Sequence, residues 1–189
     1  KIKLIIKVFG EEKEAARIAR NIIKAREFKR ITLVTELVDI IEKSKRKNYL
    51  KKINVCTKTF QALRIFVNKE TTELIEGLIK ASKIVKFGGK IIVVSFHSIE
   101  DRVVKYFFTN YSTNKSKPSR YLPIDSSKSN FLFESYKNIF LKPHEDEVLK
   151  NPSSRSAKLR YAIRGQQNFI YPDELKIKFK KYLELENNV

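Results

Sequence analysis

The sequence contains no methionine, a single cysteine and two histidines among its 189 residues. One cysteine, Cys56, excludes an internal disulfide and fits a reducing compartment. Together with only His97 and His144, it supplies too few ligands for a structural zinc site, so we expect no metal. Because methionine is absent even at position 1 and the chain opens within an apolar pattern, we expect it to be a piece of a longer polypeptide.

Glycine is also scarce, and its spacing excludes a familiar nucleotide-binding loop. The five glycines, at positions 10, 77, 88, 89 and 165, form neither G-x-G nor G-x-x-x-x-G-K. A nucleotide-binding α/β domain normally opens with such a loop, followed by an acidic residue for the ribose. We therefore expect no cofactor-anchoring loop, and no cofactor-binding residue, within these 189 residues.

No apolar run approaches the length of a membrane span, and the lysine-rich start has no signal-peptide core. The composition, with 42% hydrophobic and 32% charged residues, is that of a soluble globular protein. We expect no membrane partner. The oligomeric state is left open by the sequence.

Positive charge dominates the sequence. The net charge is +19, from 40 basic and 21 acidic residues, which favours a polyanionic partner, although a codon bias toward lysine is an alternative. Residues 1–56 carry 16 basic and 7 acidic side chains, a net +9. There Lys13, Arg17, Arg20 and Lys24 recur at helical spacing, as either phosphate contacts or an ordinary solvated face.

Hydrophobic periodicity predicts helices with one α/β stretch near the middle of the chain. The expected helices are 1–27, with a break at Gly10, then 32–41, 59–68, 73–86 and, after Pro172, 173–186. The expected core includes Leu37, Val38, Ile40 and Ile41 of the second and Phe60, Leu63 and Val67 of the third. We expect a basic loop at 43–52, a long loop at 109–156 and a half-buried strand at 158–164.

Residues 87–108 form the central unit: a Gly-Gly turn, a strand, a polar corner and a helix. The unbroken β-branched run 91–94 predicts a strand covered on both faces, as in a parallel sheet. Ser98 is expected to cap the following helix, with Glu100 and Asp101 in its first turn. Ligands gather at the carboxyl ends of such strands, which makes His97 a candidate; a cap and a satisfied histidine are the alternative.

Four segments in order resemble the MraW or RsmH family, the small-subunit ribosomal RNA cytosine-N4 methyltransferases. They are FGEEKEAARIARNIIKAR (9–26), TKTFQALRIFVN (57–68), FGGKIIVVSFHSIEDRVVKYFF (87–108) and KPHEDEVLKNPSSRSAKLRYAIR (142–164). The chain departs from the family pattern at 54–56, where H-P-A is expected, and at Lys58, Phe87 and Ser153. These departures affect an RNA or loop contact and remove no scaffold element.

The resemblance implies an α/β fold: the carboxyl-terminal half of a class I S-adenosylmethionine-dependent methyltransferase, Rossmann-like, preceded by part of an inserted all-helical domain. Residues 1–68 then belong to the helical substrate-recognition domain and 69–166 to the methyltransferase domain. Residues 167–189 form a basic tail helix. The main S-adenosylmethionine site lies in the family's amino-terminal half, which this sequence lacks.

The resemblance also implies methylation of the exocyclic N4 of a cytidine in small-subunit ribosomal RNA. The expected partner is this RNA or the small ribosomal subunit that contains it. The expected location is the bacterial cytoplasm, with the mitochondrial matrix as the alternative. Candidate catalytic residues are His97, Ser98, Glu100 and Asp101, with Ser95 beside them. Candidate RNA contacts are Arg17, Arg20, Lys24, Lys58, Arg64, Asn68, Arg155, Ser156 and Arg160; Thr59 and Gln61 join Arg64 and Asn68 at the domain junction.

A structural role remains the alternative for these groups. The residues at 95–101 would then cap the helix and make hydrogen bonds within the fold, and the basic residues at 155–160 would keep the edge of the strand soluble. Two other functions compete with the enzyme. One is a non-catalytic RNA- or ribosome-binding module, and the other is a methyltransferase acting on a different RNA or on DNA cytosine. We expect the chain by itself to be inactive and to bind S-adenosylmethionine weakly or not at all.

Overall fold

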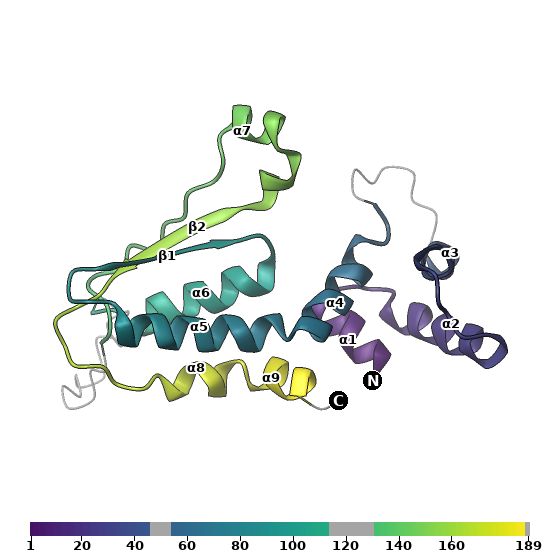
Figure 1. The fold of residues 1–189 in the computed structure, drawn as a ribbon, viewed down its shortest axis with the longest axis horizontal. Helices are drawn as coiled ribbons and strands as arrows, with labels where there is room; N and C mark the ends of the chain where they lie inside the picture. Colours follow the sequence, from purple (N-terminus) through teal and green to yellow (C-terminus); the bar gives the residue numbers. More distant parts are fainter. Residues whose placement is uncertain (46–53, 114–130, 188–189) are drawn as a thin grey trace, which may run out of the picture. The chain divides into compact units, whose positions relative to one another are not determined.

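The computed structural model describes residues 1–45, 54–113 and 131–187, and the chain divides into two compact units (Figure 1). The first unit comprises Lys1–Glu70 with Lys181–Val189, and the second comprises Thr71–Lys180. The domain boundary expected after residue 68 lies two residues before this division. Across the described ranges, no helix combines the length and the apolar character needed to cross a bilayer.

Four helices build the amino-terminal part of the first unit. They are α1 (Ile2–Phe9), α2 (Ala15–Phe28), α3 (Val34–Ser44) and α4 (Thr57–Asn68). The predicted break at Gly10 is confirmed, and α3 runs three residues beyond its expected end at Ile41. Most of the basic loop expected at 43–52 lies outside the described residues.

The core of this unit forms where the apolar stripes of its helices meet. Ile6 of α1, Ile18 and Ile22 of α2, and Ile41 of α3 are at most 3% exposed and form one cluster with Cys56. Leu37, Val38 and Ile40 pack against it, as predicted. In α4 the buried positions are Thr59, Ala62 and Ile65; Val67, which was expected in the core, is 73% exposed because it lies on the opposite side of the helix.

Gly10 is required where α1 meets the start of α4. A Cβ at this position would lie 2.5 Å from the carbonyl oxygen of Lys58 and 2.7 Å from that of Ile6, and both are backbone atoms that cannot move independently. We expect Gly10→Ala to lower the free energy of unfolding by about 1–3 kcal/mol, measured by urea unfolding. The control is Gly77→Ala in helix α5 (Glu70–Ile84), where no atom lies within 4 Å of the new Cβ; it should stabilise by about 0.5–1 kcal/mol. Equal effects of the two substitutions would contradict the close-approach explanation.

A buried ion pair fixes the corner between α1 and α2. The Glu12 carboxylate lies 2.5 Å from the Lys45 ammonium, both side chains being less than 10% exposed, and Lys45 also donates to the carbonyl of Val55. Burial by itself would raise the pKa of Glu12, but the hydrogen bond from Lys45 and the backbone N–H of Glu14 outweigh it and leave the pKa below its usual value. The Glu12 carboxylate therefore stays ionised at neutral pH.

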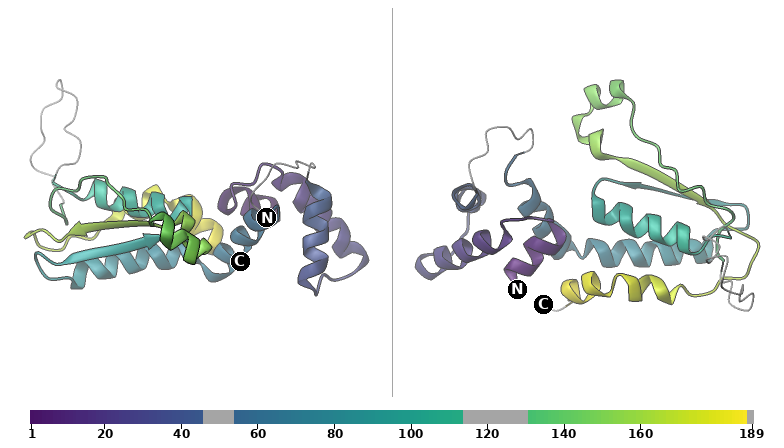
Figure 2. Two further views of the ribbon diagram at one scale, coloured as in Figure 1. Left: turned by 90° about the horizontal axis from the view of Figure 1, so that it is seen from above. Right: turned by 180° about the vertical axis from the view of Figure 1, so that it is seen from behind.

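The second unit consists of a two-stranded sheet with helices beside it (Figure 2). Its elements are α5 (Glu70–Ile84, beginning one residue before the division), β1 (Lys90–Ser95), α6 (Ser98–Asn110), α7 (Glu145–Lys150), a short 3-10 helix (Pro152–Ser156), β2 (Lys158–Ile163) and α8 (Asp173–Lys178). Helix α6 packs against both strands.

The sheet corrects the prediction for the central strand. β1 and β2 are antiparallel, with Lys90 opposite Ile163 and Ser95 opposite Lys158. Ile91 is buried, but Ile92 is 60% and Val94 48% exposed, so one face of β1 is uncovered among the described residues. The continuous apolar run predicted a strand covered on both faces because side chains alternate between faces and every position was apolar.

Much of the segment expected to be a long loop contributes to the core. Phe133 lies 5.2 Å from Phe107 and 5.3 Å from Phe108, ring centre to ring centre, with both pairs edge to face, and Tyr136 packs against Phe108. Leu132 and Phe133 are fully buried. The aromatics appeared scattered because their partners on α6 are more than twenty residues away. Residues 114–130 of this segment lie outside the described part of the chain.

The tail forms two helices rather than the single helix expected at 173–186. Helix α8 ends before Phe179, and α9 spans Lys180–Asn187. Leu175 and Phe179 are buried, and the Phe179 ring meets Tyr106 of α6 at 5.6 Å in an edge-to-face contact. Asn110 donates to Glu174, and Lys176 pairs with Glu76. Helix α8 is therefore part of the core of the second unit.

Candidate functional site

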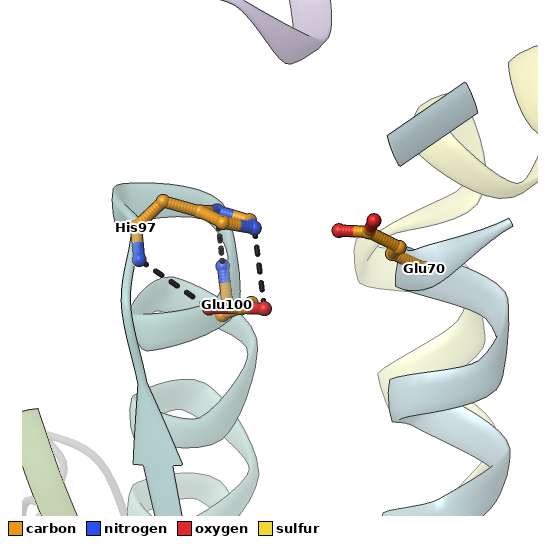
Figure 3. A group of neighbouring side chains, drawn as sticks. All are labelled: Glu70, His97 and Glu100. Atoms are coloured by element: carbon orange, nitrogen blue, oxygen red, sulfur yellow. Dashed lines mark hydrogen bonds and ion pairs between the residues drawn. The ribbon is translucent and has the colours of Figure 1, made fainter. Parts of the chain in front are cut away.

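The corner between β1 and α6 is a reciprocal cap made by His97 and Glu100 (Figure 3). The Nδ1 atom of His97 accepts from the backbone N–H of Glu100 at 3.4 Å, while Glu100 Oε2 accepts from the N–H groups of Phe96 and His97 at 2.8 and 3.3 Å. The cap is thus His97, and the expectation that Ser98 caps this helix is wrong: Ser98 is the first helical residue, and it is exposed. Sequence reasoning missed this because histidine is not among the usual N-cap residues.

These contacts set the proton positions at the corner. A nitrogen that accepts a hydrogen bond carries no proton, so the His97 proton lies on Nε2, which is 3.2 Å from Glu100 Oε1. Burial by itself would raise the pKa of Glu100, but the hydrogen bonds from His97 and the Phe96 N–H hold it below its usual value. The Glu100 carboxylate therefore stays ionised at neutral pH beside the imidazole.

Asp101, the other candidate carboxylate, faces β2 instead. Its two oxygens accept from Arg160 Nε at 2.7 Å and Nη2 at 3.3 Å, and from Lys158 Nζ at 2.9 Å. Burial would raise the pKa of Asp101, but these two cations lower it overall. The carboxylate links the first turn of α6 to β2.

Arg160 is almost completely enclosed, with 3% of its side chain exposed. Besides Asp101, its guanidinium donates to the Tyr136 hydroxyl and to Asn138 Oδ1, both at 3.1 Å, and lies 5.0 Å from the centre of the Phe140 ring. These contacts use four of its five N–H donors, and burial keeps the fifth from solvent. The placement favours the structural alternative for Arg160 over a phosphate contact.

Two more residues complete the corner. Ser95 is buried, and its hydroxyl donates to the carbonyl of Lys158 at 3.3 Å across the two strands. Phe96, which the sequence did not single out, is 53% exposed between β1 and His97. The signal for Phe96 was its position: an aromatic residue just past the carboxyl end of a strand, immediately before the histidine.

The candidate RNA contacts of the first unit lie mostly at its surface. Arg20, Lys24 and Lys58 are exposed, and Lys58 donates to the carbonyl of Glu11 at 3.2 Å. Arg17 is also exposed and pairs with Glu14. The stripe on α2 lies opposite the buried positions Ile18 and Ile22, as a solvated helix face does.

Arg64 and Asn68 of α4 meet at one acidic side chain. Arg64 makes a two-bond contact with Glu70, Nε to Oε1 at 2.8 Å and Nη2 to Oε2 at 3.1 Å, and Asn68 Nδ2 lies 3.3 Å from the same Oε1. Arg64 is still more than half exposed. Thr59 is buried in the same helix, and Gln61 donates to the carbonyl of Phe9.

Arg155 and Ser156 lie in the short 3-10 helix that precedes β2, and both are exposed. The Arg155 guanidinium donates to the nearby Pro152 carbonyl. His144, expected to be incidental, is the N-cap of α7 and accepts from the Asp146 N–H, with 80% of its side chain exposed. Both histidines of the chain are therefore helix caps.

The glycines of the described structure do not form a cradle for a nucleotide cofactor. Gly88, with φ of +77°, and Gly89 make the turn that enters β1, so they lie at the amino end of the strand, opposite the corner. A Cβ on Gly89 would lie 2.6 Å from the Val85 side chain, which shows that this space is filled by packing. This Gly-Gly turn is therefore part of the packing at the start of β1 and is not a cradle for a phosphate or a nucleotide.

Comparison of this chain with known proteins identifies its relatives. A profile of the MraW methylase family matches residues 1–164. Proteins named ribosomal RNA small subunit methyltransferase H are similar to it: one from Bartonella bacilliformis is 40% identical over 97% of this chain and 55% of its own length. The protein from Sulfurihydrogenibium azorense is 45% identical over 85% of this chain and 50% of its own length. The protein from Sinorhizobium fredii is 41% identical over 87% of this chain and 48% of its own length. The chain spans about half the length of these curated relatives. With the family profile covering most of its residues, this chain belongs to the MraW methylase family.

Proposed function

We propose that this chain supplies the substrate side of a small-subunit ribosomal RNA methyltransferase that acts on the exocyclic N4 of a cytidine. The observation that supports this most is the family match, because it covers the helical unit and the strand–corner–helix together. S-adenosylmethionine is the methyl donor that such a family implies. Because the sequence carries no G-x-G loop, we place the cofactor site in the half of the relatives that this chain does not match.

The uncovered face of β1 supports a larger class I fold. Ile92 and Val94 leave apolar surface exposed, and β2 is the one strand paired with β1 among the described residues. A strand buried on both faces is what the sequence of β1 fits best. We propose that the remaining strands of a full-length family member pair with the free edge of β1 and that helices connecting those strands cover this face.

The chemistry of the reaction requires positioning above all. The lone pair of the cytosine amine is delocalised into the ring, so the amine must be held in line with the methyl group while acceptors take up its hydrogens. The base must also leave its stack to be reached. Phe96 offers an exposed aromatic face at the corner on which an extruded base can stack.

His97 and Glu100 are the pair that we propose to meet the base. In the chain by itself, His97 Nε2 faces Glu100 Oε1 at 3.2 Å, so a cytosine that enters the corner would take over this contact and donate from its amine to the carboxylate. Such a pair can orient the edge of a cytosine and accept a hydrogen from its amine. Asp101 acts in this proposal as a positioning residue, because its oxygens are engaged by Arg160 and Lys158.

The cations on α2, with Lys58, supply the RNA contacts in this proposal. Arg20 and Lys24 project from an exposed face, and side chains of this kind hold phosphates without reading sequence. The relatives named above are bacterial proteins, which favours the bacterial cytoplasm over the mitochondrial matrix.

Tritium transfer from labelled S-adenosylmethionine by the protein as expressed from its gene tests this function. We expect label on purified small subunits and none on DNA, with N4-methylcytidine recovered after digestion to nucleosides. Label on DNA would contradict the substrate. In parallel, calorimetry of the 189-residue chain with S-adenosylmethionine should show no micromolar binding; such binding would contradict the location of the cofactor site.

Replacing His97 by asparagine separates its capping role from a role toward the base. Asparagine is a good N-cap, so His97→Asn should keep the fold, whereas His97→Ala should lose about 1 kcal/mol of stability. In the transfer assay we expect His97→Asn to lower turnover about 100-fold or more, because the imidazole is lost. The matched control is His144→Asn, since His144 also caps a helix through Nδ1. Full turnover by His97→Asn would contradict a role of the imidazole toward the base, and His97 would then serve only as the helix cap.

A further inference from the structure

The end of α2 carries, beside the cations proposed above as RNA contacts, an exposed aromatic ring that those contacts do not use. Phe28, the last residue of the helix, is 91% exposed, the largest exposed fraction among the exposed hydrophobic residues of the described chain. A phenylalanine that leaves its whole ring in water forgoes about 1.5–3 kcal/mol of burial. Among the described residues, no ring or cation is paired with it.

Cations surround this ring in the sequence and on the helix. Arg20 and Lys24 lie eight and four residues before Phe28, so the three side chains share one face of α2. Arg26 precedes it, and Lys29 and Arg30 follow it; all are exposed. We call these six residues (Arg20, Lys24, Arg26, Phe28, Lys29 and Arg30) the basic-aromatic corner.

The acidic neighbours do not neutralise this surface. Glu36 pairs with Lys29 at 2.8 Å, and Glu27 is exposed beside Phe28. Five cations against two carboxylates leave the corner with a net charge of +3. Within the described structure, Arg20, Lys24, Arg26 and Arg30 take part in none of the ion pairs found.

The chemistry of the corner selects its ligand. A second copy of this chain would bring another strongly positive surface, since the whole chain carries +19. A polyanion with exposed aromatic bases satisfies both parts of the corner, with its phosphates on the cations and one base on the ring. A duplex would satisfy only the cations, because its bases are stacked and paired.

We propose that the basic-aromatic corner binds an unpaired nucleotide of the substrate RNA, with the base stacked on Phe28 and the adjacent phosphates held by Arg20 and Lys24. This inference rests on the proposed function, in that the RNA is the one the enzyme methylates. The basic-aromatic corner would then give the first unit its own contact with unpaired RNA, in addition to the contact proposed at His97 and Glu100.

Two substitutions in the full chain test the stacking, with RNA binding measured over a series of salt concentrations. Phe28→Ala should weaken binding of an unpaired oligoribonucleotide by about 5- to 150-fold, the range found when a stacking aromatic is removed. It should leave the salt dependence of binding unchanged, whereas Lys24→Ala should lower the slope of log K against log salt by about 0.7. Because Phe28 is 91% exposed, its removal should not affect folding.

A fluorescent reporter tests the same contact directly. The chain has no tryptophan, so Phe28→Trp introduces a single one at the corner. We expect saturable quenching by the unpaired oligoribonucleotide and little change with heparin or an RNA duplex. The control is Leu149→Trp, at an exposed position of the acidic helix α7, which should not respond.

The outcomes separate the inference from the proposed function. If the wild-type chain binds RNA and Phe28→Ala binds equally well, the stacking contact is wrong and the RNA function stands. Equal quenching by heparin and by unpaired RNA would also overturn it, as would quenching that depends on protein concentration without RNA. If the wild-type chain binds no RNA at all, the proposed function fails as well.

Discussion

Replacing Asp101 by asparagine is expected to lower the free energy of unfolding by about 3 kcal/mol, because it leaves the buried Arg160 guanidinium without its counter-charge. Arg160 is 3% and Asp101 13% exposed, and the guanidinium makes two bonds to the carboxylate. The amide keeps the shape of the side chain but not the charge. Urea unfolding, with hydrogen exchange at β1 and β2 to isolate the second unit, measures the loss.

A control and a kinetic readout separate this role from catalysis. Asp146→Asn lies in the first turn of exposed α7, with 75% of its side chain exposed, and should change stability by no more than about 0.5 kcal/mol. If Asp101 were instead a catalytic group, Asp101→Asn would unfold like the wild type and lose methyl transfer. That result would contradict the positioning role.

The pH dependence of the same variant follows from the direction of the pKa shift. The pKa of Asp101 is lowered in the folded state, so its stabilisation is fully present above the unfolded-state value of about 3.9. It is lost as the pH falls through the folded-state pKa, because the proton then removes the charge in both states. The stability difference between wild type and Asp101→Asn should therefore be constant near neutral pH and shrink below about pH 4. A difference that grew on acidification would contradict the ion pair.

Replacing Arg164 by methionine is expected to cost about 3–5 kcal/mol, since it removes one donor group that serves four backbone carbonyls. The Arg164 guanidinium donates to the carbonyls of Ser82, Leu132, Gly165 and Gln167 at 2.7–3.2 Å and lies 5.6 Å from the Phe87 ring. The side chain joins the end of α5, the segment at Leu132 and the end of β2. Both the Ser82 and the Leu132 contacts are buried; the Leu132 carbonyl would keep the backbone N–H of Gly165 at 2.9 Å, whereas the Ser82 carbonyl would lose the donor that Arg164 supplies.

Lysine at the same position gives an intermediate expectation. Arg164→Lys keeps a charge and three donors, but a single ammonium cannot span carbonyls arranged around a planar fork, so about half of the loss should remain. Arg155→Met removes an exposed arginine and should change stability by no more than about 0.5 kcal/mol. Thermal unfolding measures these effects, at about 2–4 °C per kcal/mol for a chain of this size. If Arg164→Met unfolded thermally at the same midpoint as the wild type, other donors would have to replace the guanidinium at these carbonyls.

The sequence by itself determined the helices of the first unit, the strand–corner–helix and the family. The apolar spacing of Ile18 and Ile22 and the break at Gly10 are local signals that depend on neighbouring residues only. The four family segments carry the same kind of information, because each is a continuous run. The candidate residues His97 and Glu100 were found in this way and lie in contact.

Only the tertiary structure decided which polar residues are engaged and which are free. Asp101 and Arg160 are 59 residues apart, so no local pattern could show that each satisfies the other. The same holds for Phe133, whose ring partners lie on α6, and for the uncovered face of β1, which depends on which strands are present beside it. Conversely, the full exposure of Phe28 could not be read from a sequence in which it follows an apolar helix. Contacts between distant segments decide burial, and burial decides whether a charged or aromatic side chain holds the fold or remains available to a ligand.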